Sequence, residues 1–161
     1  MNKFTIELDP AEASDLRCWL SAKDSLREPL SSGYQGEVYL YDGPKGFRII
    51  KEALGTGIQY RLGRKMLQRE FEAYKRLQDV PGIPRCFGLL DERFLVLEYV
   101  EGKGLREPDN DLVERETYFA ELLKIIKQMH DVGVVHNDLK RKDNVLCLLY
   151  TSDAADEEDS V

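Results

Sequence analysis

The sequence predicts an α+β fold built on an antiparallel sheet. Alternating apolar patterns typical of strands come first, a helical pattern follows, and strands and a helix then come once more before a polar loop. Turn signals between the strand patterns indicate hairpins, which favour antiparallel pairing. With 161 residues, 42% of them hydrophobic and 33% charged, the chain has the size and composition of one globular domain, which excludes collagen, a coiled coil and wholesale disorder.

The net charge of −7 is concentrated near the C-terminal end of the sequence. Residues 147–161 hold five acids and no Lys or Arg, so the remainder is close to neutral and lacks the basic surface of a nucleic-acid-binding protein. The three cysteines are scattered, and there is no secretory signal. Since no apolar run approaches the roughly 20 residues of a membrane helix, we expect a cytoplasmic protein with reduced thiols and no membrane span.

Residues 1–29 are interpreted as an N-terminal extension that packs on the main domain. The alternation over Phe4–Leu8 predicts a short strand. Asp9 and Pro10 are typical of a helix cap and of the first helical position. The apolar face of that helix consists of Leu16, Trp19 and Leu20.

A glycine-bearing hairpin, a third strand and a helix are predicted next. Residues 30–43 alternate around glycines and end in an Asp42-Gly43 turn. The third strand covers Phe47–Ala53, and a connector over residues 54–63 leads to a helix over residues 64–80. The apolar face of this helix consists of Leu67, Phe71, Tyr74 and Leu77.

Two more strands and a second helix complete the pattern. Residues 85–90 and 93–100 are predicted strands joined by an Asp91-Glu92 turn. A polar linker over residues 101–111 leads to a helix over residues 111–133. The predicted buried stripe of this helix consists of Leu112, Phe119, Leu122, Leu123, Ile126 and Met129.

Four features carry possible chemistry, and each has an ordinary structural explanation. The glycines of the Gly33–Gly36 segment would let a backbone turn approach phosphates, although a glycine hairpin is more often only a turn. Lys51, within an apolar strand, either pairs with an acid or extends its ammonium to solvent. Glu70 lies toward the apolar face of its helix, so it is either a solvated edge residue or the partner of Lys51.

The fourth feature is the polar cluster over residues 136–144, directly after Val134 and Val135. It combines His136, two acids, amides and three cations. A charged surface segment is the alternative explanation, but its position after an apolar pair favours a functional loop.

These features, in this order, resemble the protein-kinase-like fold: a glycine-rich hairpin, a strand Lys, a helix Glu, a hinge strand and a catalytic loop of the H-x-D-L-K type. The sequence of this loop is similar to that of the corresponding loop in bacterial lipopolysaccharide-core sugar kinases and in RIO-type kinases. The resemblance covers about residues 30–146. It implies that residues 30–102 form a kinase N-lobe, an antiparallel sheet plus one helix, together with the hinge. Residues 103–146 would form the start of a helical C-lobe.

The resemblance implies ATP and Mg²⁺ as cofactors and a role for each matching residue. In the nucleotide site, Ser31, Gly33 and Gly36 match the phosphate loop, with Ser31 in place of its first glycine. Val38 matches the residue under the adenine ring, and Leu97 matches the residue at the back of the pocket. The hinge is matched by Glu98, Tyr99 and Val100. In the catalytic machinery, Lys51 matches the Lys that holds the α- and β-phosphates, Glu70 its helix partner, Asp138 the base, and Lys140 the Lys at the γ-phosphate.

The magnesium-binding Asn of the family matches Asn144, which sits one residue late relative to the usual loop. Asp143 occupies the usual position, and its carboxylate is also a suitable Mg²⁺ ligand. We prefer Asn144 and keep Asp143 as the alternative.

After Leu146 the sequence contains no Asp-Phe-Gly, the magnesium-binding motif of the family. Residues 147–156 back-translate to a string that resembles a sequencing-library adapter, so we interpret residues 147–161 as disordered read-through of a truncated gene; a genuine acidic tail is the alternative. Such a truncated chain is expected to be inactive as written.

The predicted function is an ATP-dependent phosphotransferase that transfers the γ-phosphate to a protein Ser/Thr hydroxyl. The alternatives are a lipopolysaccharide-core sugar kinase, which would work at the periphery of the inner membrane, and a nucleotide-binding pseudokinase or fragment without catalysis. The expected partners are therefore ATP and an acceptor protein or lipopolysaccharide sugar.

Overall fold

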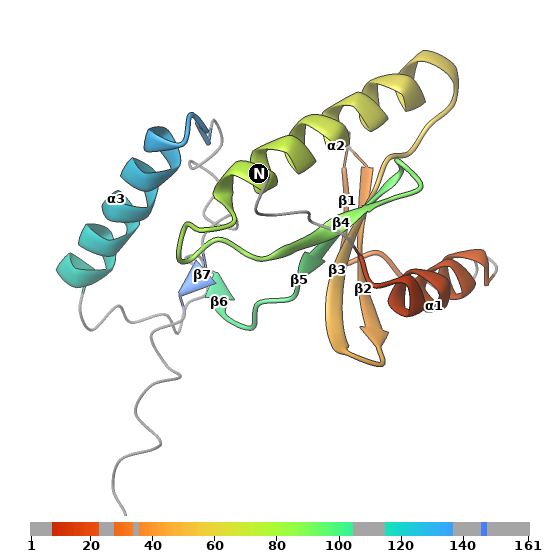
Figure 1. Cartoon of the computed structure of the whole chain (residues 1–161), viewed down its shortest axis with the longest axis horizontal. Coiled ribbons are helices and arrows are strands. Elements are labelled where there is room, and N and C mark those ends of the chain that lie inside the picture. Colours follow the sequence, from red (N-terminus) through yellow and green to blue (C-terminus); the bar gives the residue numbers. More distant parts are fainter. Residues whose placement is uncertain (1–7, 23–27, 34–35, 105–114, 137–145, 148–161) are drawn as a thin grey trace, which may run out of the picture. The chain divides into compact units, whose positions relative to one another are not determined.

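A computed structural model describes residues 8–22, 28–33, 36–104, 115–136 and 146–147 (Figure 1). The chain divides into two units, one of Met1–Tyr99 with Val132–Val134 and one of Val100–Asp131 with Val135–Val161. The segment boundaries predicted at residues 29/30, 102/103 and 146/147 stay predictions. Of the predicted strand over Phe4–Leu8 only Leu8 is described, and it belongs to no strand. Of the predicted disordered tail only Cys147 is described, and it lies in a short strand instead.

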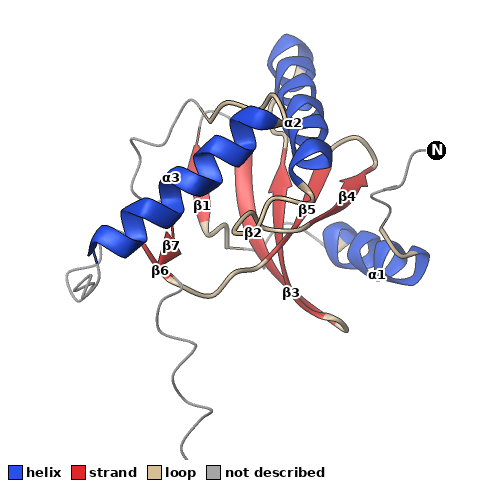
Figure 2. Cartoon of the chain, turned by 60° about the vertical axis from the view of Figure 1, so that its left-hand side comes forward, coloured by secondary structure: helices blue, strands red, loops and turns tan. Residues whose placement is uncertain are grey.

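The first unit contains a five-stranded sheet in which every neighbouring pair is antiparallel, so the predicted α+β class is confirmed. The strands lie in the order β1-β2-β3-β5-β4. Their bounds are Ser31–Gly33 for β1, Gly36–Gly43 for β2, Gly46–Glu52 for β3, Cys86–Leu90 for β4 and Phe94–Glu98 for β5. Figure 2 shows these strands in red with helices α1 and α2 beside the sheet.

The turn of the β4–β5 hairpin was predicted correctly from the sequence, whereas the turn of the β2–β3 hairpin was not. The β2–β3 turn was predicted at Asp42-Gly43, but both residues belong to β2 and the turn consists of Pro44 and Lys45. Gly46, with φ 94°, opens the next strand in a conformation that glycine adopts without penalty. The predicted Asp91-Glu92 turn between β4 and β5 is confirmed, with both residues in the left-handed region.

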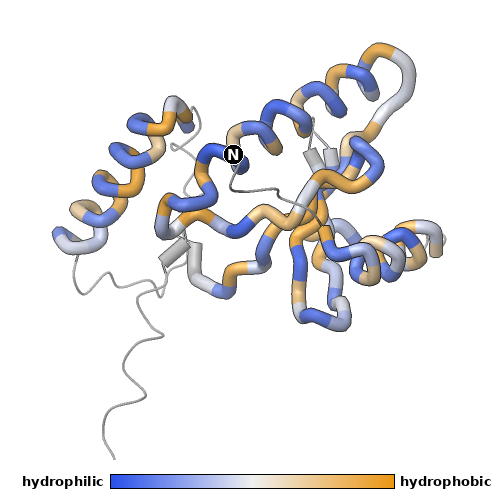
Figure 3. The backbone as a smooth tube through the Cα atoms, viewed as in Figure 1, coloured by the Kyte–Doolittle hydropathy of each residue, from blue (hydrophilic) through white to orange (hydrophobic). Residues whose placement is uncertain are grey.

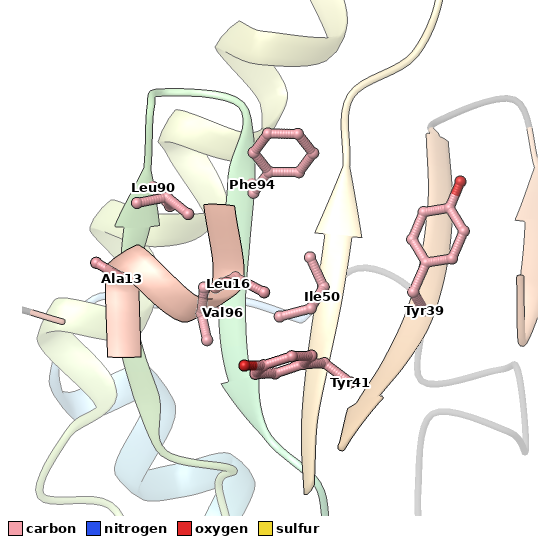
Figure 4. Close-up of a cluster of buried hydrophobic side chains, with 8 residues drawn as sticks. All are labelled: Ala13, Leu16, Tyr39, Tyr41, Ile50, Leu90, Phe94 and Val96. Atoms are coloured by element: carbon pink, nitrogen blue, oxygen red, sulfur yellow. The ribbon is translucent and has the colours of Figure 1, made fainter. Parts of the chain in front are cut away.

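Helix α1 (Pro10–Ser21) begins as predicted and covers one face of the sheet. The Asp9 side chain accepts a hydrogen bond from the Ala11 N–H at 2.8 Å, and Pro10 follows it in the first turn. Leu16 is fully buried against β3 and β5, and the ring of Trp19 lies 5.1 Å from that of Tyr41. Figure 4 shows this cluster: Ala13, Leu16, Tyr39, Tyr41, Ile50, Leu90, Phe94 and Val96.

Ion pairs join α1 to the sheet at three places. Buried Glu12 accepts a hydrogen bond from Arg48 of β3 at 2.9 Å. Arg17 pairs with Asp91 of the β4–β5 turn at 2.8 Å, and Lys45 of the β2–β3 turn pairs with Asp9. Since a buried carboxylate is costly without a partner, the Glu12–Arg48 pair ties the orientation of α1 to β3.

Helix α2 (Gly57–Leu77) covers the opposite face and is longer than predicted. It begins seven residues before residue 64, inside the predicted connector. Gly63 does not interrupt it, because the missing side chain lets the helix approach Ala53; a Cβ at this position would lie 3.4 Å from that of Ala53. The predicted apolar face is confirmed: Leu67, Phe71 and Tyr74 pack in a second cluster with Leu95 and Leu97, and Leu77 is buried.

The second unit contains helix α3 (Arg115–Asp131) and a two-stranded ladder of β6 (Lys103–Gly104) and β7 (Leu146–Cys147). The predicted stripe of α3 is partly wrong. Met129 is buried and Leu122 and Ile126 are half-buried, but Phe119 is 41% and Leu123 66% exposed. Adjacent residues of a helix differ by about 100°, so the buried face turns toward Leu122 and away from Leu123. Leu112 lies outside the described residues.

Candidate functional site

The candidate site is built around Lys51 in the middle of the sheet. In the strand register its Cα lies across from Val38 of β2 on one side and Leu95 of β5 on the other. Because side chains alternate along a strand, Lys51 shares its face with Ile49 and points to the α2 side, while Ile50 points to the α1 side. A long cation therefore lies among apolar neighbours beneath a helix.

Helix α2 supplies the partner of this cation. The Lys51 Nζ donates to Glu70 Oε1 at 2.5 Å, and the two side chains are 33% and 34% exposed. The pairing inferred from the sequence is therefore present, and Lys51 does not extend freely to solvent. A partly desolvated ion pair of this kind restricts both side chains to one geometry.

Two ionisable groups near Glu70 are uncharged. Burial, with a smaller effect of the Glu70 carboxylate, raises the pKa of Tyr74 one turn along α2. Burial likewise raises the pKa of the Cys86 thiol on β4 to about 11. Both groups remain protonated and uncharged at neutral pH, so neither adds a negative charge that would compete with Glu70 for Lys51. Their place in the site was not predicted, although Tyr74 follows Glu70 at helical spacing; no pattern in the sequence marked Cys86.

The glycine-rich hairpin lies at the end of the same sheet. In the β1–β2 ladder Ser31 pairs with Val38 and Gly33 with Gly36. Val38 in turn pairs with Lys51 of β3, so the predicted phosphate loop is formed by the strand next to that of Lys51. Gly36 has φ 138°, and the backbone of Glu52 lies so close that a side chain at this position has no room. The tip residues 34–35 lie outside the described residues.

The end of β5 carries the residues that match the back of the pocket and the hinge. Leu97 is buried across from Ile49 and Cys86. The Glu98 N–H donates to the Arg85 carbonyl at 2.8 Å, and the Glu98 carboxylate accepts from the Arg85 N–H at 2.8 Å. The Glu98 N–H is thus already occupied within the first unit. Val100 belongs to the second unit.

The predicted catalytic loop lies outside the described residues. Asp138, Lys140, Asp143 and Asn144 lie outside the described residues, so their roles stay predictions; His136, just before them, is exposed. Within the described ranges no group of three or more His, Cys, Asp or Glu side chains could hold a metal ion. The described helices include none that is long and apolar enough to cross a membrane.

Comparison with known families matches the RIO domain over residues 53–148, more than half of the sequence. The chain therefore belongs to the RIO domain family, a protein-kinase-like family.

Curated relatives are named as protein kinases. The chain is 33% identical to the serine/threonine-protein kinase cds1 of Schizosaccharomyces pombe over 51% of this chain and 19% of that one. It is 28% identical to the serine/threonine-protein kinase chk-1 of Caenorhabditis briggsae, over 73% of this chain and 26% of that one. It is 26% identical to the human cell division cycle 7-related protein kinase, over 68% of this chain and 19% of that one. The matched region thus spans about a quarter or less of these relatives, and no solved structure matches the chain.

Proposed function

We propose that the protein is an ATP-dependent phosphotransferase that transfers the γ-phosphate of ATP to a Ser or Thr hydroxyl of an acceptor protein. The observation that carries this proposal is the Lys51–Glu70 ion pair, formed between a central strand and the covering helix in a chain of the RIO domain family. One N–H of the Lys51 ammonium is bound to Glu70, while its other N–H donors stay available for a ligand.

The donor set of Lys51 fits a triphosphate. An ammonium has three N–H donors and one is directed at Glu70, so two remain for the α- and β-phosphate oxygens. The side chain is about one-third exposed, which leaves it accessible to a ligand. Glu70 fixes the direction of the ammonium before the nucleotide arrives, and this preorganisation lowers the cost of binding.

Residues of β1, β2 and β5 would supply the adenine and phosphate contacts of the proposal. Val38 would lie under the adenine ring and Leu97 at the back of the pocket, while Ser31, Gly33 and Gly36 would cradle the phosphates. At the hinge, Glu98 would have to contact adenine through its carbonyl oxygen, because its N–H already donates to Arg85. Val100 would supply the backbone donor.

The catalytic part of the proposal rests on residues outside the described ranges. Asp138 would accept the proton of the acceptor hydroxyl, and Lys140 would neutralise charge on the γ-phosphate. Asn144, or Asp143 in its place, would hold Mg²⁺, which supplies charge neutralisation at the phosphates when bound.

The acceptor is proposed as a protein because the relatives are named serine/threonine-protein kinases. No observation favours a lipopolysaccharide sugar. A cytoplasmic location is part of the proposal, since ATP is found there and the described cysteines, Cys18 and Cys86, are free thiols.

The experiment compares Lys51→Met with Lys75→Met. Lys75 also forms an ion pair from α2, with Glu72 at 2.7 Å, but on the solvent side, so it is a matched control. We expect Lys51→Met to weaken ATP binding at least about tenfold by isothermal titration. Transfer of labelled γ-phosphate to a test protein such as casein is measured on the protein extended past Leu146 through an Asp-Phe-Gly segment, because the 161-residue chain is expected to be inactive. Lys51→Met should abolish this transfer, while Lys75→Met leaves both measurements unchanged.

Asp138→Ala separates binding from catalysis. We expect this variant to bind ATP as the wild type does and to transfer no phosphate, because the proposed base does not hold the nucleotide. If the extended wild-type protein binds ATP and transfers no phosphate, the protein is a nucleotide-binding protein and not an enzyme. Equal effects of Lys51→Met and Lys75→Met would contradict the proposed site.

A further inference from the structure

The first half of α2 exposes an apolar row that the nucleotide site does not use. Ile58 is 84%, Leu62 52% and Met66 37% exposed, and their spacing of four residues places them along one side of the helix. The row runs for about 12 Å, two helical turns. Figure 3 shows apolar and polar positions alternating along this helix, whose inner side is already filled by Tyr60 and Leu67.

A row of cations lies beside the apolar row. Arg61, Lys65 and Arg69 follow the same spacing of four residues and are all exposed. Within the part of the chain that the structure describes, none of the three forms an ion pair, whereas Arg64 of the same helix pairs with Glu92. The segment from Gly57 to Arg69 contains no acid at all. This outer face is therefore both apolar and uniformly positive.

These side chains do not stabilise α2 itself. Cations near the start of a helix oppose the macrodipole, and the first turn of α2 contains no acid to favour it. The helix also begins without a side-chain cap at Thr56 and includes Gly57 and Gly63, which are poor helix formers. The composition of the outer face is thus unexplained by the helix and calls for another contact.

We propose that the outer face of α2, formed by Ile58, Leu62 and Met66 with Arg61, Lys65 and Arg69, is a docking surface for an acidic amphipathic helix of a partner protein. Apolar anchors at i, i+4 and i+8 match the repeat of a second helix, and the flanking cations match carboxylates on the partner. Binding would also order the weakly supported first turns of α2. The proposal goes beyond the phosphotransferase function and does not depend on it.

The test uses the full 161-residue chain and a synthetic fluorescent peptide of about four helical turns, with Leu at i, i+4 spacing and Glu beside each Leu. We expect saturable binding by fluorescence anisotropy. Leu62→Gln and Lys65→Glu should each weaken it at least about tenfold. Leu30→Gln, at an exposed apolar residue outside the row, and Arg76→Glu, at an exposed cation at the far end of α2, should leave it unchanged.

A second readout separates docking from misfolding. Circular dichroism should show the same helix content in all four variants, since Gln and Glu are good helix formers at the three α2 positions and Leu30 lies outside the helices. Peptide binding should slow amide hydrogen exchange over residues 57–66 in the wild type and not in Leu62→Gln.

Three results would overturn the proposal. The first is no saturable binding up to about 1 mM peptide, or equal binding by the row variants and their controls. The second is binding to phosphatidylserine vesicles, lost in Leu62→Gln, without peptide binding, which would assign the face to a membrane. The third is wild-type self-association that Leu62→Gln abolishes, which would assign it to a second copy of the chain. None of these measurements involves ATP, so they leave the proposed function to its own test.

Discussion

Gly36 and Glu52 lie so close that no other residue fits at position 36. A Cβ built on Gly36 would stand 2.1 Å from the carbonyl oxygen of Glu52, and the backbone there has φ 138°. The contact joins the start of β2 to the end of β3, one residue after Lys51. The second glycine of the hairpin is thus required by packing between strands, whatever role it has at a phosphate.

Gly36→Ala is expected to destabilise the protein by roughly 3 kcal/mol or more, because it combines a strained backbone with a clash against main-chain atoms. Gly46→Ala is the matched control. Gly46 also has a positive φ, 94°, but an added Cβ there meets nothing within 4 Å, so only the strain remains and about 1 kcal/mol is expected. Urea denaturation of both variants measures the difference. Equal losses of stability would show that the close contact with Glu52 relaxes without cost.

The Arg17–Asp91 ion pair is expected to contribute stability that acid removes. The Arg17 guanidinium lowers the pKa of Asp91 below its usual value of about 3.9. A lowered folded-state pKa gives stability that is fully present above the unfolded pKa and is lost as pH falls through the folded pKa. The pair therefore contributes at neutral pH and contributes nothing once Asp91 is protonated.

Asp91→Asn tests this dependence, since Asn tolerates the left-handed conformation of residue 91 and removes only the charge. The variant should melt slightly below the wild type at pH above about 5, and the difference should shrink as the pH falls below the usual Asp pKa of about 3.9. High salt should reduce the difference, because both side chains are exposed. A difference that persists unchanged in acid would assign the effect to the shape of the turn.

Cys86 is expected to resist alkylation in the folded protein. Burial raises the pKa of its thiol to about 11, so only about one molecule in a thousand carries the thiolate at pH near 8. Cys18 is exposed on α1 and should react with iodoacetamide at least about a hundredfold faster than Cys86. Peptide mapping by mass spectrometry assigns the label to each cysteine. Similar rates at Cys18 and Cys86 would mean that the edge strand β4 opens readily.

Local patterns predicted much of the first unit. Asp9 and Pro10 located the start of α1, the Asp91-Glu92 turn located a hairpin, and the spacing of Leu67, Phe71 and Tyr74 identified the inner face of α2. These features depend on backbone sterics and on periodicities of two or 3.6 residues, which a few neighbouring residues suffice to define.

Predictions failed where a distant residue decides the outcome. The start of α2 depends on Gly63 fitting against Ala53, and the turn after β2 depends on pairing that continues to Gly43 and Gly46. The predicted stripe of α3 correctly included Met129 but wrongly added Phe119 and Leu123 and left out buried Tyr118, because several apolar residues allow more than one buried face.

The sequence by itself determined the α+β class, the hairpin glycines and the presence of Lys51 and Glu70 on a strand and a helix, since composition and periodicity are local properties. Only the tertiary structure decided that Lys51 and Glu70 meet at 2.5 Å and that Glu12 is buried against Arg48. It also decided that Ile58, Leu62 and Met66 face outward. These contacts join residues many positions apart, so they depend on the strand register and on the packing of each helix against the sheet.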